Sequence, residues 1–133
     1  MKKSFLAAIA LLLAGCAQTS TLHWTAPVPG QRSRSGTPVL WNLTAVNNGM
    51  YLFYFIPLWC GYNTRPNRHD YELGKHLLTE PEMRRMLDCY LEELKADRVE
   101  DVEFAESSSG ALGLWIIWKR SMRATGVAVK AAK

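Results

Sequence analysis

The stretch that decides the fold is MYLFYFIPLW, residues 50–59, the most apolar part of the chain after residue 15. A run this rich in aromatic residues predicts a β-strand that is covered on both faces, or covered on one face and lying against a partner on the other. Pro57 has no backbone N–H, so we expect regular pairing to lapse there. Because large apolar residues are usually buried, we expect the run to be core, with a docking patch as the alternative.

The residues before this run predict the first half of a hairpin. Positions 38–46 alternate between two faces, which is the period of a β-strand. One face carries Val39, Trp41, Leu43 and Ala45. Asn47-Asn48-Gly49 follows, and Asn-Gly favours the positive φ angles of a type I′ turn. We therefore expect a turn at residues 47–49 and antiparallel pairing of the two strands.

After a loop over residues 60–70, the chain carries its clearest helix pattern. Thr79-Glu80-Pro81-Glu82 has the form of a capping box, with Thr79 as N-cap and Glu82 reaching back to it. The apolar residues that follow form one stripe at helical spacing: Met83, Met86, Leu87, Tyr90, Leu91 and Leu94. We expect an amphipathic helix over about residues 80–96 that packs on a sheet.

Three strands are predicted after the helix, over residues 98–106, 114–118 and 122–130. Val102 and Phe104 are expected to point inward, residues 107–110 to turn the chain, and Gly126 to mark a bulge. The order ββαβββ predicts a two-layer α+β domain over residues 37–133, with one helix on a mainly antiparallel sheet of about five strands.

The chain begins with the pattern of a secretory signal. Lys2 and Lys3 precede an apolar run over residues 5–13, and small residues follow it. The run is shorter than the roughly 20 residues that a membrane-spanning helix needs. We expect residues 1–15 to be a signal peptide that is cut between Gly15 and Cys16.

The end of this segment, Leu13-Ala14-Gly15-Cys16, resembles the lipobox of bacterial lipoproteins, which is Leu, a small residue, Gly or Ala, and Cys. The resemblance implies that Cys16 receives a diacylglycerol thioether and an N-acyl chain, such as palmitate. At ~0.8 kcal/mol per buried CH₂, two or three chains anchor a protein firmly. An ordinary secretory signal that ends near a cysteine is the alternative.

The residues after Cys16 bear on location. Ala17 and Gln18 stand where Asp would retain a lipoprotein in the inner membrane, so the resemblance implies a lipid anchor in the cell outer membrane that faces the periplasm. The inner membrane and the cell surface are the alternatives. Residues 16–36 are rich in small, polar, Pro and Gly residues, so we expect a flexible tether with a mean reach of ~25 Å.

Charge is unevenly distributed along the chain. The formal net charge is +4, but all 12 acids lie in residues 69–106, between two regions that carry only bases. A basic stripe could bind phosphates, or these bases could be solvated and pair with the acids. An exported protein does not meet nucleic acid. The expected partners are membrane lipid through Cys16 and an envelope protein or the cell wall.

A second resemblance covers residues 79–130. A helix running into Leu94-Lys95-Ala96-Asp97-Arg98-Val99, a strand, a turn and a closing Ala124-Thr125-Gly126-Val127-Ala128-Val129 are similar to the small α+β domains of YbjQ-type and RcsF-type bacterial proteins. Lys95 stands where that family prefers Gly. The resemblance implies a shared fold and an envelope stress-sensing role. Cys60 and Cys89 are too few for the two bridges of RcsF-type proteins.

Cys60 and Cys89 are the thiols that remain after lipidation. In an oxidising periplasm they could form a disulfide that closes a loop of about 30 residues, worth about 3 kcal/mol on the loop-entropy argument. Cys89 falls on the polar flank of the expected helix, so the Cys60 loop would have to pass along that flank. Two free thiols are the alternative.

The sequence shows no complete set of residues for metal binding or catalysis. His69, Asp70 and His76 are candidate metal ligands, but no CxxC or HxxxH spacing occurs, and we expect no metal and no cofactor beyond the lipid on Cys16. Cys60 with His69 and Asp70 matches a catalytic set only in residue type. The serines at 107–109 lack a GxSxG setting. We therefore expect no catalytic residues and no enzyme.

The sequence thus predicts a membrane-anchored, non-catalytic lipoprotein whose small domain binds or braces another envelope component. A stress sensor or a small-ligand or metal-binding module is the first alternative. An unrecognised enzyme is the second.

Overall fold

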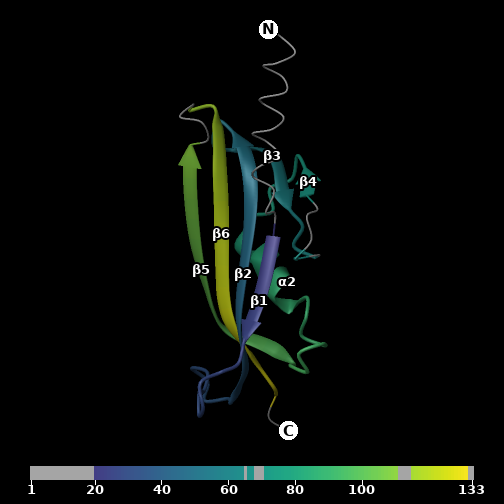
Figure 1. Ribbon diagram of the computed structural model, residues 1–133, viewed down its shortest axis with the longest axis vertical. Coiled ribbons are helices and arrows are strands. Elements are labelled where there is room, and N and C mark those ends of the chain that lie inside the picture. The colour runs from purple at the N-terminus through teal and green to yellow at the C-terminus, as the bar shows by residue number, and fades with distance from the viewer. Residues whose placement is uncertain (1–19, 65, 68–70, 111–114, 132–133) are drawn as a thin grey trace.

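The computed structural model describes residues 20–64, 66–67, 71–110 and 115–131. Its elements are β1 (Ser20–Thr25), β2 (Val39–Leu52), β3 (Ile56–Gly61), β4 (Tyr71–Leu73), α2 (Glu80–Asp88), β5 (Arg98–Gly110) and β6 (Ile117–Val129) (Figure 1). All strands join one antiparallel sheet in the order β4-β3-β2-β6-β5, and β1 also pairs with β2. The predicted α+β class is confirmed. The sheet has six strands rather than five, and the element order is ββββαββ.

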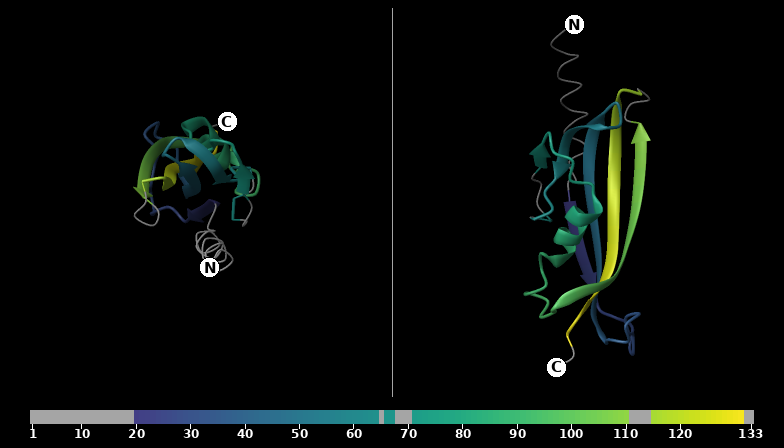
Figure 2. Two further views of the ribbon diagram at one scale, coloured as in Figure 1. Left: turned by 90° about the horizontal axis from the view of Figure 1, so that it is seen from above. Right: turned by 180° about the vertical axis from the view of Figure 1, so that it is seen from behind.

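The sheet is long because β2, β6 and β5, which run side by side, have 13 or 14 residues each. The helix α2 lies across one face of this sheet (Figures 1 and 2). β1 and β3 share one edge of β2. β1 pairs with residues 42–47 of β2, and β3 pairs with residues 49–52. The end of the sheet that holds the turn between β2 and β3 is called the tip end below.

The core lies between α2 and the face of the sheet that α2 covers. α2 contributes three fully buried side chains, Met83, Met86 and Leu87. Small residues of β6, Ala124 and Ala128, face them and allow the helix to approach the sheet closely. This burial confirms the predicted apolar stripe of the helix.

The predicted turn at residues 47–49 is wrong, since β2 continues through these residues to Leu52. Packing explains the Asn-Gly pair. A Cβ on Gly49 would lie 2.7 Å from Cys60 Sγ and 3.1 Å from the Trp59 carbonyl oxygen, so glycine is needed for close contact with β3. The buried Asn47 amide donates to the Asn63 side-chain oxygen (2.7 Å) and the Gly61 carbonyl (3.0 Å).

The chain instead turns at residues 53–55, inside the apolar run. Phe53 and Tyr54 have positive φ angles of 50° and 76°. The pairing of β3 with β2 shifts register between Met50 and Tyr51, where Tyr51 faces Pro57. The lapse in regular pairing predicted at Pro57 therefore falls beside it, at Leu58, while Pro57 is paired with Tyr51.

The helix is shorter than the predicted range of about 80–96, because α2 ends at Asp88 and turns follow. Leu94 nevertheless reaches the core from these turns. Thr79 is the N-cap residue, but it makes no side-chain cap hydrogen bond. Glu82 does not reach back either: it accepts from Asn63 Nδ2 (2.6 Å) and pairs with Arg85, so the predicted capping box is wrong.

The turns after α2 end at a residue with left-handed backbone. Lys95 has a φ of 54°, a conformation that favours glycine.

The three strands predicted after the helix are two. β5 runs from Arg98 through the serines to Gly110, so residues 107–110 do not turn the chain, and β6 is one strand over residues 117–129. The bulge lies in β5, between Glu100 and Glu103, opposite Gly126. A Cβ on Gly126 would lie 2.7 Å from Val99 Cγ1, so the glycine makes room for the bulge rather than forming it.

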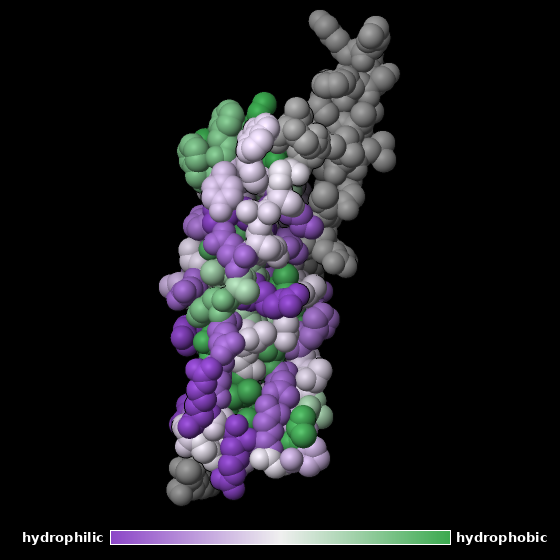
Figure 3. Space-filling view, turned by 90° about the vertical axis from the view of Figure 1, so that its left-hand side faces the viewer, coloured by the Kyte–Doolittle hydropathy of each residue, from purple (hydrophilic) through white to green (hydrophobic). Residues whose placement is uncertain are grey.

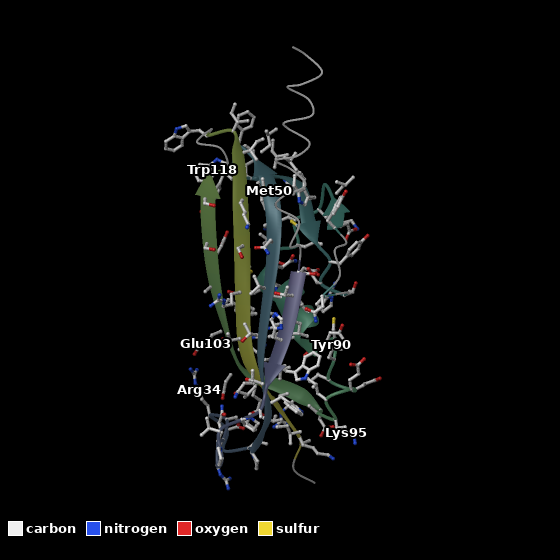
Figure 4. All side chains as sticks on the ribbon, in the orientation of Figure 1. Arg34, Met50, Tyr90, Lys95, Glu103 and Trp118 are labelled. Carbon is white, nitrogen blue, oxygen red and sulfur yellow. The ribbon has the colours of Figure 1, made fainter. Side chains whose placement is uncertain are left out.

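The expected tether contains a strand, which corrects the boundary at residue 36. Leu22 of β1 is buried, and its N–H and carbonyl both bond the Asn67 side chain at 2.9 Å. Arg34, in the loop after β1, pairs with Glu103 at 2.8 Å (Figure 4). Composition over residues 16–36 could not show these contacts because their partners are distant in sequence. Residues 16–19 lie outside the described residues.

The loop between β1 and β2 contacts Glu100 of β5, and we expect this contact to be sensitive to acid. The hydroxyls of Ser33 and Ser35, together with Arg98, lower the pKa of Glu100 from 4.5 to about 2. Because the folded pKa lies below the unfolded one, this contact stabilises the fold above pH 4.5, and the contribution is lost as the pH falls toward 2. We expect Tm to fall more steeply across that window in the wild type than in Glu100→Gln, as measured by circular dichroism. Parallel Tm curves would contradict this role for Glu100.

Candidate functional site

The structure describes some of the residues singled out from sequence. Gly15, Cys16, His69 and Asp70 lie outside the described residues. Cys60 is buried on β3, Cys89 is exposed just after α2, and both thiols are free. The possible disulfide between them is therefore absent from the structure, which has the two free thiols of the alternative. The Cys89 thiol donates instead to the Asn63 carbonyl (3.1 Å) and the Arg85 carbonyl (3.2 Å).

The most exposed apolar surface lies at the tip end. It comprises the turn between β2 and β3 and the residues that lead into β6: Phe53, Tyr54, Phe55, Ile56, Trp115 and Ile116. We call this set the aromatic tip. Trp115 is 82% exposed and Phe55 69% exposed. The expectation that the whole run 50–59 is core is therefore wrong for residues 53–56, while Met50 and Tyr51 are buried as expected.

The space-filling view shows where the aromatic tip stands in the molecule. Hydrophobic side chains gather at one end of the face in Figure 3, above a largely hydrophilic middle. Figure 4 places Met50 and Trp118 near the same end, far from Arg34 and Lys95. On the face in Figure 3, the exposed aromatic side chains therefore lie at the tip end.

The two segments of the aromatic tip hold one another in place. The Phe53 N–H donates to the Ile116 carbonyl at 2.6 Å. The Tyr54 ring meets the Trp118 ring edge-on at 5.4 Å, and the Trp115 ring lies 6.0 Å from Trp118. The Trp118 indole N–H donates to the Trp115 carbonyl at 2.9 Å. The aromatic tip is thus a built surface and not two unrelated loops.

A layer of polar contacts lies directly beneath the aromatic tip. The Arg120 guanidinium lies 4.8 Å from the Tyr51 ring centre and 4.7 Å from the Tyr54 ring centre, and it also pairs with Glu106. The Tyr51 hydroxyl contacts Cys60 Sγ at 3.2 Å and His76 Nδ1 at 2.7 Å. These contacts fix the base of the turn between β2 and β3.

Burial and charge keep this layer neutral at its centre. Burial, followed by the contact with Cys60, raises the pKa of the Tyr51 hydroxyl far above its usual range. Partial burial, followed by the positive charge of Arg120, lowers the pKa of His76. A neutral tyrosine beside a neutral histidine braces the fold, and neither group is placed as an activated base for an exposed substrate.

The two segments that form and flank the aromatic tip carry positive but no negative charge. Residues 50–61 and 115–123 contain neither Asp nor Glu. Lys119 of β6 pairs in register with Met50, is exposed and forms no ion pair among the described residues. Arg34, Arg98 and Arg120, by contrast, each pair with an acid of β5. This pairing favours the interpretation of these basic residues as solvated partners of the acids.

The described part assembles no metal or catalytic set. Across residues 20–64, 66–67, 71–110 and 115–131, no three His, Cys, Asp or Glu side chains are grouped to hold a metal ion. The predicted ligand His76 contacts Tyr51. The serines at 107–109 line a shallow depression of about 320 Å³ with Asn48, Lys119 and Ser121, and no histidine lines it.

The chain matches none of the family models, curated proteins or solved structures with which we compared it. Among the described residues, no helix has the length and hydropathy needed to cross a bilayer.

Sequence reasoning missed the aromatic tip because it treated residues 50–59 as one strand. One signal could have found it. The run is too apolar to alternate, and a second Trp-rich segment without acids follows at residues 115–118. Two such segments brought together by antiparallel strands predict an exposed cluster at the end of a sheet.

Proposed function

We propose that this chain is a bacterial lipoprotein that is exported, cut after Gly15 and held on the outer membrane by lipid on Cys16. One observation carries the proposal. Positive residues, a short apolar run, small residues and a cysteine stand in register over residues 1–16. Each feature serves one step: export, cleavage or acylation.

The folded domain supports a binding or bracing role. The buried Tyr51 hydroxyl contacts both Cys60 and His76, so these three groups are used within the fold. Its largest exposed apolar set is the aromatic tip, and such patches mark interaction sites on small domains. We infer that the domain is non-catalytic and binds or braces another component of the envelope from the periplasmic side.

The test is intact-mass analysis of the protein purified from membranes. The expected product begins at Cys16 and is heavier than the bare chain by a diacylglycerol and one acyl chain. Cys16→Ala is expected to keep residues 1–15 and to gain no lipid. Cys89→Ala is the matched control, because it removes an exposed thiol without touching the lipobox. A wild-type protein with an unmodified Cys16 or an intact Met1 would overturn the proposal.

A further inference from the structure

We propose that the aromatic tip enters the interface between the lipid and water of the membrane that holds Cys16, so that the domain stands with its tip end on the bilayer. This inference rests on the proposed lipid anchor for part of its geometry. The chemistry of the aromatic tip supports it independently.

The length of chain before β1 sets the height of the domain above the membrane. The four peptide units from Cys16 to Ser20 span at most about 14 Å. Ser20 pairs with Asn47, and β1 runs away from the tip end. From Asn47 to Leu52, β2 rises about 17 Å toward the turn between β2 and β3. A domain that stands on its tip end therefore brings the aromatic tip to the level of the lipid headgroups.

The same lengths exclude the inverted orientation. From Asn47 to Val39 at the opposite end of β2, the strand descends about 27 Å. The segment before Ser20 is about half that length, so it cannot reach a bilayer beneath the opposite end. Only an orientation with the tip end toward the membrane, or with the domain on its side, satisfies the anchor.

The composition of the aromatic tip selects the first of these orientations. Trp and Tyr are enriched at the headgroup level of membranes, where one end of the side chain is apolar and the other is wet. The aromatic tip presents Trp115 and Tyr54 together with Phe53 and Phe55. Lys119 stands beside them without an acid on either segment, which suits anionic lipid headgroups. The side of the molecule drawn in Figure 3 is instead mostly hydrophilic below the aromatic tip.

Backbone strain marks the same residues. Phe53 and Tyr54 both adopt positive φ angles, a backbone conformation that Asn and Gly accept at less cost than aromatic residues. Strain of this kind persists where the side chains serve a function, since a less strained residue would stabilise the fold. A need for aromatic side chains at the membrane accounts for their presence in this turn.

The first experiment measures contact between tryptophan and lipid tails. The lipidated full chain is reconstituted into vesicles of phosphatidylethanolamine and phosphatidylglycerol in which some lipids carry bromine on their acyl chains. Bromine quenches nearby tryptophans, so we expect emission to fall. Trp115→Phe is expected to remove most of that quenching. Trp24→Phe is the matched control, because Trp24 is also exposed but lies on β1, away from the tip end, and packs on Tyr90.

A second variant separates folding from membrane contact. Phe53→Asn combined with Tyr54→Gly supplies the residues that the turn favours, so the fold is expected to persist and Tm to stay level or rise. Quenching is expected to fall, because two aromatic side chains leave the interface and Trp118 loses its Tyr54 contact. Val28→Ser is the control for loss of an exposed apolar side chain outside the aromatic tip.

The outcomes distinguish this inference from the proposed anchor. Lipid on Cys16 with quenching that depends on Trp115 supports both. Lipid on Cys16 without such quenching overturns the tip inference and leaves the anchor. A Cys16 without lipid in a protein that still binds vesicles and shows the quenching overturns the anchor and supports the tip. Crosslinks from position 55 to a protein in intact cells, without quenching by brominated lipid, would assign the aromatic tip to a protein partner and overturn the lipid inference.

Discussion

Tyr51→Ala is expected to lower the free energy of unfolding by about 3–5 kcal/mol, the usual cost of truncating a buried aromatic residue. Tyr51 is fully buried. The Arg120 guanidinium lies 4.8 Å from the centre of its ring, and its hydroxyl contacts Cys60 and His76. A loss of this size is a large share of the roughly 5–15 kcal/mol that stabilises a domain. Urea unfolding of the purified protein, followed by circular dichroism, measures it.

Tyr51→Phe separates the ring from the hydroxyl. The phenylalanine keeps the packing and the contact with Arg120, and it loses only the hydroxyl contacts with Cys60 and His76. We expect a cost of about 1 kcal/mol, typical of one hydrogen-bonding group. Equal losses for the two variants would show that the hydroxyl rather than the ring holds the base of the aromatic tip.

Leu87→Ala is expected to cost about 2–5 kcal/mol, because it leaves a cavity between α2 and the sheet. Leu87 is fully buried, beside Met83 and Met86. The helix is short and ends at Asp88, so it has little stability of its own and depends on this packing. We expect the loss in thermal and urea unfolding, with a lowered Tm.

Leu73→Ala is the matched control for Leu87→Ala. The residue is the same, but Leu73 lies on β4 and is 69% exposed. Its replacement is expected to change the free energy of unfolding by less than about 0.5 kcal/mol. A cost near that of Leu87→Ala would mean that Leu73 is buried in solution, against a partner or a second copy.

Patterns that depend on neighbours in the sequence predicted the fold well. The stripe of Met83, Met86 and Leu87 gave the helix and its buried face, because helical spacing alone brings these residues together. Pro57 indicated irregular pairing to within one residue, because a missing N–H acts locally. The α+β class followed from these elements.

Features that depend on distant partners could not be predicted. Asn-Gly at residues 48–49 has the composition of a turn, yet Gly49 is required by Cys60 and Trp59 on β3. The residues of β1 look like a linker until Asn67 bonds the backbone of Leu22 on both sides. The serines of β5 look like a turn until β6 lies beside them.

The candidate site was predicted least, for the same reason. The residues of the aromatic tip come from two segments about sixty positions apart, and only the antiparallel pairing of β2 with β6 brings them together. Leu52 lies opposite Ile117 in that pairing, so the two segments meet at one end of the sheet. Residue spacing along the chain cannot predict that two such distant segments lie side by side.

The direction of β1 has a mechanical consequence. β1 lies antiparallel to β2 from Ser20 to Thr25. The lipid attachment that we propose at Cys16 stands four positions before Ser20. A pull between the membrane and the rest of the domain would act along the strand and load its hydrogen bonds with β2 together, in shear. Breaking them one after another, by peeling, requires a pull across the strand. A domain attached in this way would resist unfolding under a force that pulls it away from the membrane.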